Sequence, residues 1–210
     1  MNEVMDDRIV IVFDLETTGL DPDNDEIVEI ACWAGNDYSV VPDVFSSKFR
    51  NRRDVFYSLV MPSKPVSPEV VLIHGIQTVG NRDLMVRGIR HFKVPLLVDV
   101  LSDLIKWLGQ FNRPVLFAHN CFKFDAPLLL AALVQAKLYD DFNGIVSDFG
   151  DTKLELAKVL PESAPLGLAM LSEQFVPEWK KYKQQAHSAL FDVWATIKVR
   201  MHNVINVSIT

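Results

Sequence analysis

The chain has 210 residues, of which 49% are hydrophobic, with a formal net charge of −6 and two cysteines. A chain of this length and apolar content can bury a sizeable core, and we expect a single domain over residues 1–210. The composition argues against intrinsic disorder, and two cysteines are too few for the disulfide framework of a small secreted protein.

The N-terminal sequence MNEVMDDRIVIVF does not have the form of a signal peptide, because it is acidic and its apolar run is short. The sequence contains no apolar run long enough to cross a bilayer. We therefore expect an intracellular protein, cytoplasmic or nuclear, with no membrane partner.

The first third of the sequence predicts a β-meander. Residues 8–15, RIVIVFDL, are β-branched and apolar without alternation, which is typical of a strand buried on both faces. The turn LDPDND separates it from a second strand over 26–35, which a short GND connection joins to YSVV at 38–41. A further strand is predicted over 54–62, although strand, loop and insertion all stay open for 45–61.

The rest of the sequence alternates strands with helices. Ser67 and Pro68 are typical of a helix start. Further helices are predicted over 95–111, 125–138, 152–160, 166–175 and 188–205, and strands over 113–120 and 144–152. Strands first, and then strands alternating with helices, indicate an α/β fold with a mixed sheet covered by helices on both faces.

Charge is distributed unevenly along the chain. Residues 1–29 carry ten acids and one base, a balance of −9, which leaves +3 for the remainder. Basic residues cluster in 48–53, in 82–93 and in 180–183, the last with Lys180, Lys181 and Lys183. Each cluster could attract a phosphate backbone or simply form a solvated face.

Two acids end the first predicted strand. Asp14 and Glu16 are two residues apart, so their side chains point to the same face. Adjacent carboxylates resist ionisation, and a divalent cation removes the repulsion, with Mg²⁺ or Mn²⁺ favoured by oxygen ligands. A pair of exposed acids at a strand end is the alternative, and the two residues alone do not decide.

Three more residues extend this pattern. Asp125 follows an apolar strand at the mouth of a predicted helix, where it is either a metal ligand or a helix cap. His187 stands before the last helix, and Asp192 lies one turn into it among apolar neighbours. A buried acid needs a partner, which a metal ion could supply, whereas a lone histidine is more often structural.

The blocks FDLETTGL (13–20), AHNCFKFD (118–125) and HSALFD (187–192) resemble the three motifs of the DEDDh family of 3′→5′ exonucleases. This family includes proofreading subunits of DNA polymerases, ribonuclease T and the three-prime repair exonucleases, and the middle block resembles the last of these in form. The resemblance covers roughly residues 8–200. It implies a ribonuclease H-like fold, with a mixed five-stranded sheet of a three-strand antiparallel meander plus parallel strands, and helices on both faces.

The resemblance implies a metal-dependent enzyme that hydrolyses phosphodiester bonds of DNA, with RNA left open, from the 3′ end and releases 5′-mononucleotides. Two Mg²⁺ or Mn²⁺ ions would be held by Asp14, Glu16, Asp125 and Asp192, with His187 as the general base. Three alternatives stay open: an RNA-directed 3′ exoribonuclease of the same family, a non-catalytic exonuclease-like binding module, and a proofreading subunit that works only on a polymerase. The five intact motif residues argue against the module, and the middle-block spacing argues against the proofreading subunit.

The same resemblance suggests which residues meet the 3′ end. Leu20 and Ile76 would pack against the terminal base, and the segment 177–185 would be a mobile loop that carries His187. A homodimer through an edge strand near 57–62 is a further, weaker expectation. The remaining candidate substrate contacts are the turn residues Thr17, Thr18 and Gly19, the pair His119 and Asn120 (otherwise a satisfied loop pair), Phe124 beside Asp125, and Lys180, Lys181 and Lys183.

Overall fold

The structure is a computed structural model that describes residues 8–35 and 52–207. The strand expected at 38–41 and the open question about 45–51 lie outside the described residues. All the other predicted strands are present, with ends that differ by a few residues.

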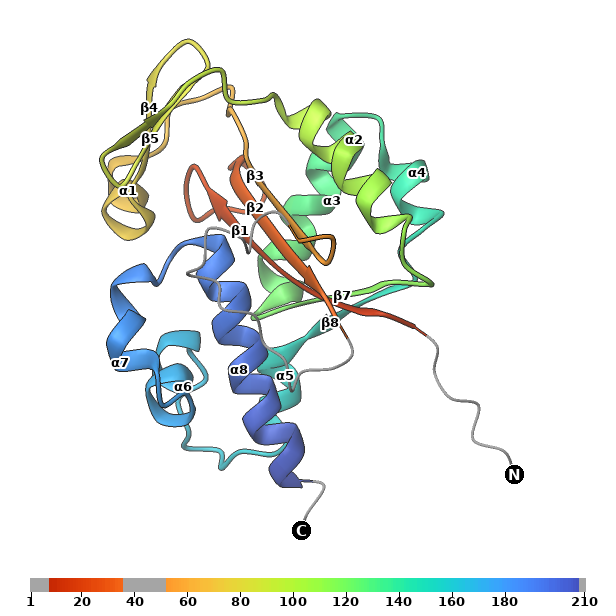
Figure 1. Ribbon diagram of the computed structural model, residues 1–210, viewed down its shortest axis with the longest axis vertical. Coiled ribbons are helices and arrows are strands. Elements are labelled where there is room, and N and C mark those ends of the chain that lie inside the picture. Colours follow the sequence, from red (N-terminus) through yellow and green to blue (C-terminus); the bar gives the residue numbers. More distant parts are fainter. Residues whose placement is uncertain (1–7, 36–51, 208–210) are drawn as a thin grey trace.

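A mixed five-stranded sheet forms the centre of the molecule (Figure 1). Its strands lie in the order β3-β2-β1-β7-β8, so β1 is central. The first three strands pair antiparallel, and β1, β7 and β8 pair parallel. Their bounds are β1 (Val10–Thr17), β2 (Ile27–Ala34), β3 (Val55–Leu59), β7 (Val115–Ala118) and β8 (Asp148–Asp151). The predicted fold class is thereby confirmed.

Helices cover both faces of this sheet (Figure 1). Alternate side chains of each strand point to opposite sides, so the apolar strands present a surface for packing on either face. Val12 and Trp33 pack against α8 (Ala189–Val207), whereas Ile11 and Phe13 share a core with the helices of the other face. That other face carries α2 (Leu97–Leu108), α3 (Asp125–Gln135) and α4 (Tyr139–Asn143), and beside α8 lie α5 (Thr152–Ala157), α6 (Leu168–Phe175) and α7 (Trp179–Tyr182).

A second, three-stranded sheet was not predicted from the sequence. It consists of β4 (Ile76–Gly80), β5 (Asp83–Val86) and β6 (Ile89–His91), all antiparallel, and follows α1 (Pro68–His74). Its strands have three to five residues each and mix polar with apolar side chains, so no alternating pattern marks them. Ile76 and Leu84 hold it to a small core that also contains Val28 of the large sheet. Figure 1 places it beside the end of the large sheet where β1 leads into the following turn.

The segment 177–185, expected as a loop, is helical. It forms α7 and a 3₁₀ turn (Lys183–Gln185), and Trp179 is buried against Phe191 of α8 at a ring distance of 5.4 Å. Within residues 8–35 and 52–207, no helix has the length and apolar character needed to cross a bilayer. The homodimer stays a prediction.

Candidate active site

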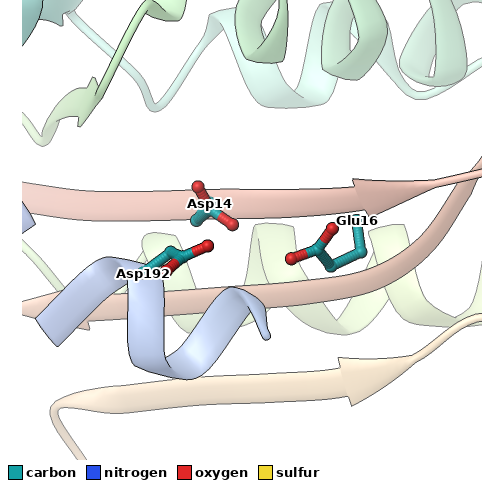
Figure 2. A group of neighbouring side chains, drawn as sticks. All are labelled: Asp14, Glu16 and Asp192. Atoms are coloured by element: carbon teal, nitrogen blue, oxygen red, sulfur yellow. The ribbon is translucent and has the colours of Figure 1, made fainter. Parts of the chain in front are cut away.

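Three carboxylates converge between the central strand and the last helix. Asp14 and Glu16 project from β1, and Asp192 projects from the first turn of α8 to meet them (Figure 2). One oxygen of each lies within 4.8 Å of the others. The strand period brings the first two to one face, as predicted. The helix position of Asp192 supplies the third carboxylate.

The three acids are costly to ionise in this setting. Burial and the neighbouring charges of Asp192 and Asp125 raise the pKa of Asp14 well above its usual range. The pKa of Glu16 is raised by burial and by Asp192. Burial raises the pKa of Asp192 to about 7, although a hydrogen bond from the His187 backbone lowers it. A converging set of carboxylates, Glu16 buried and Asp14 and Asp192 half-buried, suits a hard divalent cation, which would offset both the burial and the repulsion.

Asp125 belongs to the same pocket but stands apart from the three converging acids. It is the first residue of α3, whose N-cap is Phe124, and no side-chain hydrogen bond caps this helix. Burial raises the pKa of Asp125 to about 8, although hydrogen bonds from the backbone amides of Asp125 and Leu15 lower it. Asp125 therefore does not act as the helix cap that was its alternative interpretation.

His187 stands at the mouth of the pocket, immediately before α8. Its backbone N–H donates to Oδ2 of Asp192 at 3.1 Å, and its backbone is in the left-handed region with φ of 59°. Partial burial and the charge of Arg87 lower the pKa of its imidazole. The ring is therefore mainly neutral near pH 7, the form that a general base requires.

The pocket has a volume of about 260 Å³ and holds the five motif residues together. Leu20 and Ile73 give it an apolar rim, with 69% and 42% of their surface exposed. Its lining consists of Asp14, Leu15, Glu16, Thr17, Leu20, Val70, Ile73, His74, His119, Asn120, Phe124, Asp125, His187 and Asp192. Acids at the floor, a histidine at the mouth and apolar side chains at the rim suit a phosphodiester with an attached base.

One predicted substrate contact lies elsewhere. Ile76 is 1% exposed and is buried in the core beneath the small sheet, so the structure does not bring it to the pocket. The chain reverses at Gly75, where φ is 75°, and this turn directs Ile76 inward as the first residue of β4. Ile73, three residues earlier on α1, lines the pocket instead.

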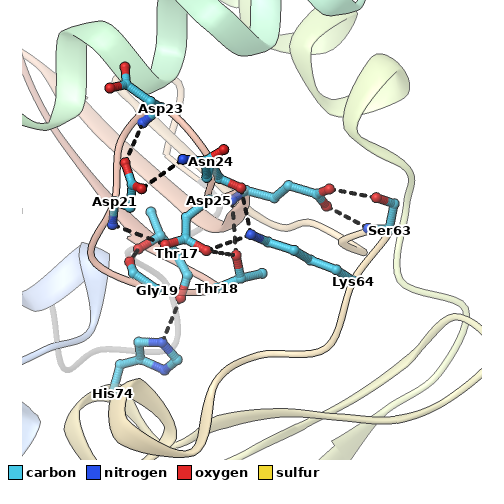
Figure 3. A network of polar contacts seen from close by, with 11 residues as sticks. Thr17, Thr18, Gly19, Asp21, Asp23, Asn24, Asp25, Ser63, Lys64 and His74 are labelled. Carbon is cyan, nitrogen blue, oxygen red and sulfur yellow. Dashed lines mark hydrogen bonds and ion pairs between the residues drawn. The ribbon is translucent and has the colours of Figure 1, made fainter.

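The turn after β1 is stabilised largely by its own contacts (Figure 3). The hydroxyl of Thr18 donates to Asp25 Oδ1 at 2.9 Å, and Lys64 pairs with the same oxygen at 2.7 Å. A Cβ on Gly19 would lie 2.2 Å from Asp25 Oδ2, so the close approach that this glycine allows is that of Asp25. Of the predicted turn contacts, Thr17 lines the pocket, whereas Thr18 and Gly19 are not part of its lining.

His119 and Asn120 line the pocket but have partners within the protein. The ring nitrogens of His119 lie 3.1 Å from the Thr152 hydroxyl and 2.8 Å from the Leu166 carbonyl. Asn120 accepts from Lys153 Nζ at 3.2 Å. These contacts match the satisfied loop pair that was one of the two interpretations. Phe124 lines the pocket beside Asp125 and also packs on the main core.

The three lysines of the basic cluster at 180–183 lie on α7 and the 3₁₀ turn. All three are exposed, and none is part of the pocket lining. Lys181 Nζ lies over the Tyr182 ring at 4.7 Å. The structure therefore leaves a role in strand binding as a prediction.

Glu29 supports the site and was not recognised in the sequence. It lies opposite Glu16 on β2 and is only 2% exposed. Its carboxylate accepts from the backbone N–H of Ala189 and from the Tyr57 hydroxyl, both at 2.8 Å. It thereby fixes the start of α8, the helix that carries Asp192. An acid in the middle of an otherwise apolar strand was the sign that could have revealed it.

Comparison with known proteins agrees with this geometry. A family model described as an exonuclease, RNase_T, matches residues 11–200. Among curated proteins, the chain is 27% identical over 196 residues to DNA polymerase III PolC-type of Bacillus subtilis (strain 168). It is 30% identical over 195 residues to the same-named protein of Listeria innocua. These alignments cover 93% and 91% of this chain and 11% of each relative, so the chain spans about a tenth of these relatives.

Solved structures of Escherichia coli Exonuclease I have the same fold. The complex with a dT13 oligonucleotide aligns with a TM-score of 0.66 at 14% identity, over 96% of this chain and 42% of that one. A zinc-bound complex with single-stranded DNA aligns at 0.68 and 15% identity, over 96% and 42%. The three sequence motifs, the mixed sheet and the family match lead to one conclusion: the chain belongs to the DEDDh-type 3′→5′ exonuclease family and has its ribonuclease H-like fold.

Proposed function

We propose that this protein is a metal-dependent 3′→5′ exonuclease that hydrolyses the terminal phosphodiester bond of DNA and releases 5′-mononucleotides. The observation that carries the proposal is that Asp14, Glu16, Asp125, His187 and Asp192 meet in one pocket. Membership of an exonuclease family supports a nuclease, and the oligonucleotide complexes of Exonuclease I favour a single-stranded DNA end as substrate.

The acids of the pocket are the proposed metal ligands. Asp14, Glu16 and Asp192 would hold one divalent ion, Mg²⁺ or Mn²⁺, and Asp125 together with Asp14 would hold a second. When bound, such ions supply positive charge that favours the ionised carboxylates and the additional negative charge of the reacting phosphate. Each carboxylate is held in place by the element that carries it: β1 for Asp14 and Glu16, α8 for Asp192 and α3 for Asp125.

His187 is the proposed general base. Its lowered pKa keeps the imidazole neutral near pH 7, so the ring can take a proton from the attacking water. Its side chain is exposed at the mouth of the pocket, so the proton can then pass to solvent. The bond between its backbone N–H and Asp192 fixes its place relative to the acids.

The apolar rim is proposed to hold the terminal nucleoside. Leu20 and Ile73 offer exposed apolar surface at the pocket edge, against which a base can pack. Every base has an apolar face, so such contacts discriminate weakly between bases. We therefore expect little sequence preference.

A second candidate is the same reaction carried out as proofreading within a polymerase assembly. The similarity to PolC-type DNA polymerases favours it, because nearly all of this chain aligns with about a tenth of each of those proteins. This similarity outweighs the spacing of the middle block, which had argued against a polymerase partner. An RNA substrate stays open, because one or two contacts to the 2′ hydroxyl decide it.

The test is a panel of 5′-labelled substrates with Mg²⁺ or Mn²⁺: single-stranded DNA, duplex DNA with a mismatched end, single-stranded RNA and duplex RNA. We expect stepwise shortening from the 3′ end of single-stranded DNA, no activity with a chelator, and none for Asp14→Ala. Preferred action on the mismatched duplex would favour the proofreading role, and a preference for RNA would favour the exoribonuclease. Absence of hydrolysis on every substrate would refute the proposed function.

A further inference from the structure

Arg87 binds the segment that leads into His187. This arginine lies in the turn between β5 and β6, outside the three sequence motifs. Its guanidinium donates to four consecutive backbone carbonyls, at 3.0 Å for Gln184, 3.2 Å for Gln185, 2.7 Å for Ala186 and 2.9 Å for His187. These acceptors lie about a hundred residues from Arg87 in the sequence, and His187 is 100 residues away.

These contacts occupy the whole guanidinium group. Nη1 also donates to the side-chain oxygen of Gln185 at 3.2 Å, and Nε donates to the His74 carbonyl at 3.3 Å. An arginine has five N–H groups, and every guanidinium nitrogen is engaged with an acceptor of the protein. The side chain is therefore committed to this segment, which argues against a direct role in binding a substrate phosphate.

The local backbone is arranged around this arginine. Arg87 and Gly88 form a two-residue hairpin turn with φ of 48° and 84°, a conformation that favours Asn-Gly and that a residue with a long side chain such as arginine rarely adopts. The Arg87 N–H donates to the Gly75 carbonyl at 2.8 Å. A Cβ on Gly75 would lie 2.8 Å from Cγ of Arg87, so this glycine leaves room for the side chain.

The same turn is tied to the strand that carries the acids. The N–H of Ile76 donates to Nδ1 of His74 at 3.0 Å, so Nε2 carries the proton of this neutral ring. Nε2 then donates to the carbonyl of Thr17, the last residue of β1, at 3.0 Å (Figure 3). His74 and Arg87 thus connect the end of β1 to the segment before α8.

We propose that Arg87 is a positioning residue that sets the place of His187 relative to Asp14 and Glu16. The small sheet is then the support for the catalytic histidine, and this inference rests on the proposed function. Other arginines of the 82–93 cluster serve the small sheet itself. Arg90 pairs with Asp83 at 2.8 Å, and Arg82 donates to the Val94 carbonyl.

The test compares Arg87→Ala and Arg87→Lys with Arg90→Ala, a matched loss of an arginine from the same sheet. The substrate is the p-nitrophenyl ester of thymidine 5′-monophosphate, which is too short to report on strand binding. Because small misplacements of a catalytic group cost about 10- to 100-fold in rate, we expect Arg87→Ala to lower kcat by that factor with KM within about twofold. Arg87→Lys should recover part of the loss, and Arg90→Ala should match the wild type.

A double variant separates positioning from other effects. If Arg87 acts through His187, Arg87→Ala combined with His187→Ala should be no slower than His187→Ala alone, within about twofold. Equal factors of loss in both backgrounds, or full activity of Arg87→Ala, would overturn the inference.

Hydrogen exchange gives a readout that does not depend on activity. Arg87→Ala should speed exchange in the peptide covering 183–190, and leave peptides of β1 and α3 at the wild-type rate. Unchanged exchange at 183–190 would also overturn the inference. An inactive wild type would refute the proposed function instead, and in that case the exchange experiment alone decides whether Arg87 holds the segment.

Discussion

Replacement of Asp192 by asparagine should stabilise the metal-free protein, although it removes a proposed metal ligand. Asparagine has nearly the same shape and keeps an oxygen that can accept from the His187 N–H, now 3.1 Å from Oδ2. It lacks the charge that burial and the nearby Glu29 make unfavourable. The substitution therefore isolates the electrostatic cost of the buried acid.

The magnitude follows from the pKa of Asp192, about 7 in the folded protein against 3.8 for an ordinary aspartate. Between these values the folded state keeps a proton that the unfolded state has lost, so stability falls as pH rises, by about 1.4 kcal/mol per pH unit. The cost is absent below the unfolded pKa and complete above the folded one, with an upper value of about 4 kcal/mol. Protons redistribute among coupled acids, so we expect a net gain on the order of 2 kcal/mol for Asp192→Asn.

The assay is urea unfolding with a chelator at about pH 8 and about pH 4, and then with Mg²⁺ at the higher pH. Asp192→Asn should be the more stable protein at the higher pH and equal to the wild type at the lower one. Mg²⁺ at a hundred times its Kd should add about 2.7 kcal/mol to the wild type and much less to the variant.

A surface acid provides the control for this experiment. Asp103→Asn removes an exposed carboxylate that pairs with Lys106 on α2, and such pairs contribute at most about 1 kcal/mol. It should therefore show neither the gain at high pH nor the loss of the Mg²⁺ effect. If Asp192→Asn were less stable than the wild type in chelator at high pH, the reasoning about repulsion would be refuted.

Substitutions at three residues, each with a milder or control variant, test the support and the rim of the site. Gly19→Ala should cost about 1–3 kcal/mol in urea unfolding, because its Cβ would lie 2.2 Å from a carboxylate oxygen, whereas Gly167→Ala, with open space around it, should cost less than about 1 kcal/mol. Glu29→Ala should cost about 1–3 kcal/mol because the buried backbone N–H of Ala189 loses its acceptor, and Glu29→Gln clearly less, because its amide oxygen can still accept from that N–H. Ile73→Ala should raise KM for single-stranded DNA several-fold. Leu72 is 88% exposed on the same helix and lies outside the pocket, so Leu72→Ala should leave KM unchanged. Equal KM values for both variants would contradict the proposed base contact.

The sequence predicted the part of the site that local periodicity determines. Asp14 and Glu16 share a face because a strand repeats every two residues, and this holds whatever the strand packs against. Asp192 stood out because a helix with apolar neighbours on both sides is buried, and an acid within it needs compensation. Much of the central sheet could be predicted as well, since β1, β2 and β7 are largely apolar.

Contacts that depend on the path of the connections could not be predicted. Whether Ile73 or Ile76 faces the pocket is decided by the reversal at Gly75, which the sequence marks only as a glycine. The contact of Arg87 with the segment before His187 joins residues about a hundred positions apart. Its existence depends on the small sheet, whose strands are too short to carry a periodic pattern.

The supports of the site explain why its acids cannot relieve their repulsion by moving apart. β1 pairs with β2 at both Asp14 and Glu16, so the backbone that carries these acids can move away from Asp192 only if those strand pairs break. Glu29 fixes the start of α8, so the helix cannot withdraw either. Uptake of a proton or of a cation is then the remaining route of relief. Protons and metal ions compete for these carboxylates, so the protonated cluster has a low affinity for metal. Metal affinity should therefore rise with pH over the same range in which the metal-free protein loses stability.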